Sequence, residues 1–109
     1  MKISLTDLSD HLLAAAREAP AGRSAETLQG GHAKVLRQTV IALLGERALD
    51  EHESPGEATL QVLRGHVRLQ AGDQHTEGGA GDLLTIPDAR HSLHALADSV
   101  VLLTVAKLV

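Results

Sequence analysis

The first twenty residues of the chain carry an apolar stripe with the period of an α-helix. Ser4 and Asp7 stand at the spacing of a capping box, with Asp in place of the usual Glu or Gln. Pro20 and Gly22 end the pattern. The sequence therefore predicts a short N-terminal helix that packs its apolar stripe on the rest of the protein or on a partner subunit. The stripe consists of Leu5, Leu8, Leu12, Leu13 and Ala16.

From Ser24 onward the pattern changes to short apolar runs separated by turn residues. Runs of this kind predict the strands of a sandwich or barrel. We expect Arg64-Gly65-His66 to form a tight hairpin turn between two of them. The predicted strands are Val35–Leu44, Ala48–His52, Thr59–Leu63, Val67–Gln70, Leu83–Ile86, His91–Leu96 and Val100–Ala106.

The fold class that these patterns predict is all-β, a barrel or jelly roll with a short N-terminal α-helix. The length of 109 residues fits a single domain. We assign residues 1–22 to the helix and a linker, and residues 23–109 to the barrel. A domain of this size buries a modest share of its surface, so we expect the chain to gain stability by forming a homodimer.

Composition narrows the partners that the protein can have. The chain has no Phe, Tyr or Trp, so its core must be aliphatic, and it lacks the aromatic faces on which proteins stack bases or cage cations. The net charge of −4 gives no positive footprint for nucleic acids or anionic membranes. With no cysteine and no apolar run at the N-terminus, we expect a cytoplasmic protein with no nucleic-acid or membrane partner.

Two segments resemble the two sequence motifs of the cupin superfamily. Residues 49–65 read LDEHESPGEATLQVLRG, similar to a first motif with a His-x-His pair, a Glu or other ligand, and a glycine after a VLxG strand. Residues 81–91 read GDLLTIPDARH, similar to a second motif in which GD, Pro and His recur in that order. The resemblance implies a cupin jelly-roll barrel. Small, free-standing bacterial cupins with a PGxATLQVL signature share it, and they imply a fold more than an activity.

The resemblance also implies a metal site, but the ligand set is incomplete in this chain. His52 and His91 stand at two of the four ligand positions, whereas Ser54 and Ala58 occupy the other two. A divalent transition metal such as Fe, Ni, Zn or Mn takes at least three protein ligands. Gln38, on a neighbouring predicted strand, is a candidate for supplying an amide oxygen.

The interior of the predicted barrel should present an aliphatic pocket with few polar groups. Alternation along a strand sends neighbouring side chains to opposite faces. If His52, Ala58 and His91 point inward, the residues that share their faces should line the pocket: Ser54, Leu60, Val62, Leu93 and Ala95. The remaining histidines are expected at the rim or the surface.

Three functions remain open at this point. The first is a cupin without demonstrated catalysis that binds a small, largely apolar or weakly acidic molecule. The second is a metal-dependent cupin enzyme, of the oxygenase or isomerase type, that uses His52, His91 and a third ligand. The third is a ligand-sensing regulatory protein that acts through a separate partner.

Overall fold

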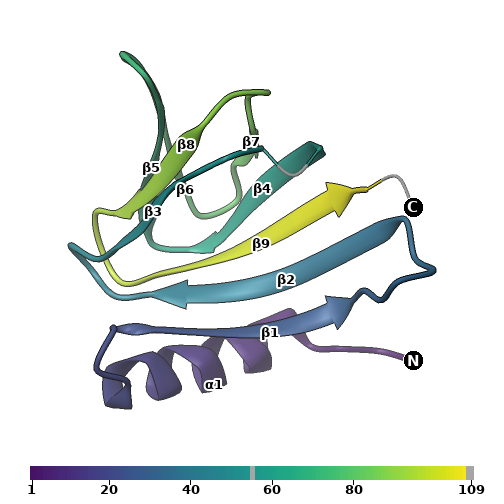
Figure 1. The fold of residues 1–109 in the computed structure, drawn as a ribbon. Helices are drawn as coiled ribbons and strands as arrows, with labels where there is room; N and C mark the ends of the chain where they lie inside the picture. The colour runs from purple at the N-terminus through teal and green to yellow at the C-terminus, as the bar shows by residue number, and fades with distance from the viewer. Residues whose placement is uncertain (55, 108–109) are drawn as a thin grey trace.

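The computed structural model of the protein describes residues 1–54 and 56–107, which form one helix and nine strands (Figure 1). The elements are α1 (Leu5–Glu18), β1 (Arg23–Gln29), β2 (Leu36–Leu43), β3 (Ala48–His52), β4 (Glu57–Arg64), β5 (His66–Ala71), β6 (Gln74–Gly79), β7 (Leu83–Thr85), β8 (His91–Ala95) and β9 (Ser99–Ala106).

The strands form two antiparallel sheets that face each other. One sheet has the strand order β1-β2-β9-β4-β7 and the other has the order β3-β8-β5-β6. Aliphatic side chains from both sheets, such as Val62 of β4 and Leu69 of β5, form one core cluster between them. The predicted all-β jelly roll with a short N-terminal helix is therefore confirmed.

Helix α1 forms a third layer on the outer face of the five-stranded sheet (Figure 1). The Ser4 hydroxyl accepts a hydrogen bond from the Asp7 amide at 3.2 Å, as expected for an N-cap. The helix ends before Pro20, at Glu18. Its predicted stripe packs on apolar side chains of the sheet, and the second core cluster joins Leu12, Leu13 and Ala16 to Val40, Ala42 and Val100.

Two strands were not predicted from the sequence. Both β1 and β6 lie at the edge of a sheet and consist mainly of polar residues, RSAETLQ and QHTEGG. Polar residues are common on edge strands, where they discourage pairing with other chains. The apolar runs that identified the other strands are therefore missing from these two.

The prediction of a hairpin at Gly65 is wrong. A tight turn is present there, but the two strands that it joins do not pair with each other. Strand β4 pairs with β7 and β9, whereas β5 pairs with β6 and β8. The turn at Gly65 carries the chain from one sheet to the other. Its φ of 83° favours glycine, and a Cβ at this position would lie 2.4 Å from the Asp98 carbonyl oxygen.

The barrel has two unlike ends. Residues 45–47, 64–66 and 95–99 lie at one end, which we call the closed end. Residues 30–36, 52–54, 71–74 and 85–91 lie at the other end, which we call the open end. In Figure 1 the closed end lies on the left, where β2 ends and β9 begins. Among the described residues, no helix is long and apolar enough to cross a bilayer.

Candidate functional site

Two histidines meet at the open end of the barrel. His52 is the last residue of β3 and His91 is the first residue of β8, and the two are register partners in the antiparallel pair. Their ring centroids lie 4.4 Å apart in an edge-to-face arrangement with an interplanar angle of 62°. The structure therefore brings together the two histidines that the sequence interpretation placed in one pocket.

Each of these rings is oriented by the same backbone contact. The Nδ1 atom of His52 lies 2.9 Å from the Asp50 carbonyl oxygen, and Nδ1 of His91 lies 2.9 Å from the Ala89 carbonyl oxygen. A carbonyl oxygen only accepts hydrogen bonds, so each Nδ1 carries the proton and donates it. In the neutral rings, both Nε2 atoms therefore keep a lone pair for a ligand.

The two rings border a small aliphatic pocket of about 150 Å³. His91 is buried, with 3% of its surface exposed, whereas His52 is exposed. His91 therefore lies inside the barrel and His52 lies at the rim. Apart from these two rings, the lining is entirely aliphatic: Ile41, Leu49, Leu60, Leu69, Ile86, Leu93 and Leu103.

Two of the leucines expected in the pocket line it, Leu60 of β4 and Leu93 of β8. Val62 shares the inward face of β4 but lies deeper, fully buried in the core between the sheets. Ala58 and Ala95 are also buried and do not line this pocket. Alternation along the strand gave the correct face for these residues, but not their depth.

Ser54 and Gln38 do not line the pocket. The Ser54 hydroxyl donates a hydrogen bond to the Gly56 carbonyl oxygen at 3.0 Å, because the chain has left β3 and turns at this point. Gln38 precedes Val40 by two positions and so lies on the helix-covered face of its sheet. There its amide donates to the Thr104 hydroxyl at 3.2 Å.

Five lining residues were missed by the sequence interpretation: Ile41, Leu49, Leu69, Ile86 and Leu103. Residues 40–42 of β2 and 100–103 of β9 are apolar on both faces, since one face meets the barrel core and the other meets α1. A strand buried on both sides shows no alternation. For Leu69 the signal was present, because Val67 and Leu69 alternate with Arg68 and Gln70.

The residues at this site do not fit a tightly bound divalent metal. Within residues 1–54 and 56–107, no three His, Cys, Asp or Glu side chains are close enough to hold one ion. Ala58, at the position of a family ligand, has no donor atom, and the Ser54 hydroxyl already bonds to Gly56. Two imidazoles alone fall short of the three protein ligands that such a metal takes.

An ion-pair cluster joins the two strands that carry the histidines. Arg90 donates from Nε to Glu51 at 3.0 Å and from Nη1 to Glu53 at 2.9 Å. The hydrogen bond to Glu51, followed by that to Glu53, raises the pKa of Arg90 above its ordinary value. Because these residues flank His52 and His91 in sequence, the cluster links the two segments that carry the rings.

Comparison with solved structures identifies the architecture. An RmlC-like cupin from Desulfovibrio desulfuricans aligns with 77% of this chain and 81% of its own, with a TM-score of 0.67 and 23% identity. The protein has the cupin fold. A conserved protein of unknown function from Streptococcus pyogenes, SPY1581, aligns with 84% of this chain and 79% of its own, with a TM-score of 0.74 and 24% identity.

A larger enzyme also shares this fold. Salicylate 1,2-dioxygenase from Pseudaminobacter salicylatoxidans aligns with 92% of this chain but only 33% of its own, with a TM-score of 0.76 and 18% identity. No protein-family model and no curated protein sequence matches the chain. At these identities the similarity concerns the fold alone.

Proposed function

We propose that this cupin binds a small, largely apolar molecule in the pocket beneath His52 and His91, without a metal. The observation that carries the proposal is an aliphatic hollow of about 150 Å³ whose polar groups are two imidazoles with free Nε2 atoms. Apolar walls with a few converging polar groups are typical of small-molecule sites.

The volume sets the size of the ligand. An engineered apolar cavity of about 150 Å³ in another protein holds one benzene molecule. We therefore expect a single ring or a short branched chain, which would gain about 25 cal/mol for each Å² of apolar surface that it buries. Larger ligands would have to extend out of the open end past His52, which is exposed.

The histidines define the polar end of the ligand. Nε2 of His91 accepts a hydrogen bond when the ring is neutral, so a ligand hydroxyl or protonated carboxyl is its natural partner. A ligand without such a group would leave the buried Nε2 without a partner, which costs about 1–3 kcal/mol. The pocket should therefore prefer a ring or chain that carries one hydroxyl or carboxyl group.

Calorimetric titration of chelator-treated protein tests this proposal. Benzene and phenol form a matched pair, because they differ by the single hydroxyl that can donate to His91 Nε2. We expect phenol to bind about tenfold more tightly than benzene. Tight binding that appears only after Fe, Ni, Zn or Mn is added would overturn the proposal and favour a metal-dependent cupin.

A pair of histidine variants locates the binding site. His91→Leu removes Nε2 from the pocket, so it should abolish the preference for phenol over benzene. His11→Leu makes the same change on the exposed side of α1 and should leave every affinity unchanged. Equal losses in the two variants, or none in either, would contradict the assignment of the pocket.

A further inference from the structure

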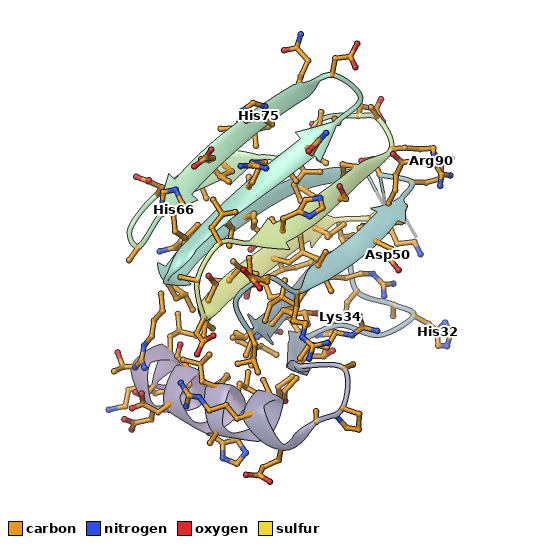
Figure 2. All side chains as sticks on the ribbon, turned by 90° about the vertical axis from the view of Figure 1, so that its left-hand side faces the viewer. His32, Lys34, Asp50, His66, His75 and Arg90 are labelled. Carbon is orange, nitrogen blue, oxygen red and sulfur yellow. The ribbon has the colours of Figure 1, made fainter. Side chains whose placement is uncertain are left out.

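A second hollow lies at the open end, where the chain passes from β1 to β2. It measures about 420 Å³ and shares no lining residue with the histidine pocket. In Figure 2, His32 and Lys34 lie on this connection, on the same side of the view as Asp50 and Arg90. The lining consists of Thr27, Leu28, Gln29, Gly30, Gly31, Arg37 and Thr39.

Arg37 provides the positive charge of this hollow. It pairs in register with Val105, which belongs to the core between the sheets, so Arg37 lies on the inward face of β2. Its Nη2 donates to the Gly31 carbonyl oxygen at 3.1 Å. Its Nε is shielded from solvent and has no hydrogen-bond partner among the described residues. The Nε–H group of the guanidinium is therefore shielded from water without a hydrogen bond to the described part of the protein in its place.

The other partly buried arginines are neutralised, and Arg37 is not. Arg64 pairs with Asp10, and Arg68 pairs with Glu77 at 3.7 Å. Within the described part of the chain, no carboxylate pairs with Arg37, and none lines the hollow. The sequence from residue 27 to residue 45 contains His32, Lys34 and Arg37 but no Asp or Glu, although the whole chain carries a net charge of −4.

Hydroxyl and backbone groups complete the surroundings of the guanidinium. Thr27 and Thr39 are cross-strand partners, and Thr39 precedes the pocket residue Ile41 by two positions, so both threonines share the inward face with Arg37. Gly30 and Gly31 form the adjacent wall. The φ of 122° at Gly31 favours glycine, and it lets the loop turn so that its carbonyl oxygen accepts from both Arg37 and the Lys34 amide.

We infer that this hollow binds an oxyanion, the carboxylate or phosphate group of a small molecule. Charge-assisted hydrogen bonds from a guanidinium to such groups are among the strongest in proteins, and partial burial strengthens the attraction because the local dielectric constant is low. Arg37 Nη1 and the two threonine hydroxyls supply donors of the required kind. The inference is independent of the histidine pocket, because the two sites have different residues and different ligands.

Titration of ¹⁵N-labelled protein with inorganic phosphate and, separately, with acetate tests the inference and distinguishes the two oxyanions. We expect saturable shifts of the Gly30 and Gly31 amide signals with at least one anion, weakening as sodium chloride is added. Arg37→Gln should weaken binding by about tenfold or more, whereas Arg37→Lys keeps the charge and should retain part of the affinity. Arg23→Gln, an exposed position on β1 outside the hollow, should not change it.

Two results would overturn the inference. One is a linear, unsaturated drift of the glycine signals with both anions. The other is equal affinity in the Arg37→Gln variant and the unaltered protein, both with well-dispersed spectra that show the fold is intact. Shifts confined to residues around His52 and His91 would likewise assign the anion to the other pocket and contradict this one.

Discussion

The closed and open ends of the barrel differ in how the connections between strands are held. At the closed end, backbone and side-chain hydrogen bonds join the connection at residues 95–99 to those at 45–47 and 64–66. Ser99 Oγ accepts from the His66 amide at 3.1 Å, Asp98 accepts from the Gly45 amide at 2.9 Å, and the Glu46 amide donates to the Ala95 carbonyl oxygen at 2.8 Å. This end is fixed by contacts between residues far apart in the sequence.

At the open end, several side-chain hydrogen bonds of the connections are local. Ser54 bonds to Gly56, His91 to Ala89, and Arg37 to Gly31, each within a few residues. Long-range backbone bonds join Lys107 to Val35 at 2.9 Å and Ile86 to Ala58 at 3.0 Å. The long-range side-chain pairing of Arg90 with Glu51 and Glu53 lies on the exposed surface.

The difference indicates that the two ends of the barrel have different roles, one in stability and the other in ligand binding. The closed end holds the two sheets together, while the open end keeps polar groups available for ligands. Sites on loops that a rigid scaffold positions are common in proteins. Substitutions at the closed end should therefore affect stability first, and substitutions at the open end should affect binding first.

Two glycine substitutions should show the largest contrast. Gly65→Ala at the closed end forces a Cβ to within 2.3 Å of Ser99 Oγ, at a φ of 83°. We expect a loss of about 3 kcal/mol or more in the free energy of unfolding. Gly72→Ala, in the β5–β6 turn at the open end, has a φ of 58° but nothing within 4 Å, and should cost only about 1–2 kcal/mol. Urea denaturation followed by circular dichroism measures both, and equal losses would contradict the contrast.

Two serine substitutions give the next largest effect. Ser99 is buried and exchanges hydrogen bonds with the His66 backbone, so Ser99→Ala leaves a backbone amide without its partner and should cost about 1–3 kcal/mol. Ser54→Ala at the open end should change stability by less than about 0.5 kcal/mol. It should also leave ligand affinity unchanged, because Ser54 does not line the pocket. A large effect of Ser54→Ala on ligand affinity would show that the hydroxyl enters the site in solution.

Removal of the Arg90 ion pairs should affect binding more than stability. Arg90→Met keeps the length of the side chain but frees the segments that carry His52 and His91, so phenol affinity should fall by a few-fold. Arg17→Met removes the exposed pair with Asp98 at the closed end and should leave that affinity unchanged. Calorimetry of both variants at low salt makes the comparison. If phenol binds Arg90→Met as tightly as the unaltered protein, the cluster does not position the histidines.

The smallest effect concerns the pH dependence of stability near His66. The hydrogen bond from His66 Nε2, at 3.0 Å, lowers the pKa of Glu77 below its ordinary value of 4.5. The ionised carboxylate is therefore favoured by folding, so its contribution is present above pH 4.5 and is lost as the pH falls through the lowered pKa. Glu77→Gln should lower the melting temperature slightly near neutral pH and not at strongly acidic pH. A difference that is equal at both pH values would contradict this assignment.

Much of this fold can be predicted from local patterns, and the residues that cannot be predicted share physical causes. The α1 stripe and the alternating strands are visible because each buries one face. Strands β1 and β6 are polar edge strands, so they lack the apolar runs that reveal a strand. Strands β2 and β9 are predicted by their apolar runs, but parts of them are apolar on both faces, so alternation does not show which face points inward. For this reason Gln38 was expected inside the barrel, whereas it lies on the helix-covered face of its sheet.

The candidate site could be predicted only in part for a related reason. The cupin motifs identify His52 and His91, but the depth of Val62 and the turn at Ser54 depend on packing between distant segments. The basic residues His32, Lys34 and Arg37 are visible in the sequence, but the sequence does not show the hollow around Arg37 or that Arg37 has no carboxylate partner among the described residues. The homodimer expected from the size of the chain stays a prediction.

The central claim is that a metal-free aliphatic pocket beneath two histidines binds a small molecule. Methyl NMR tests this claim directly. The chain has no Phe, Tyr or Trp, so ring-current shifts of methyl signals on addition of an aromatic ligand come mainly from the ligand itself. In chelator-treated protein, phenol should shift the methyl signals of Ile41, Leu60 and Leu93 with one saturable affinity, and His91→Leu should weaken it. Methyl shifts spread evenly over the surface, or seen only after a divalent metal is added, would contradict the account.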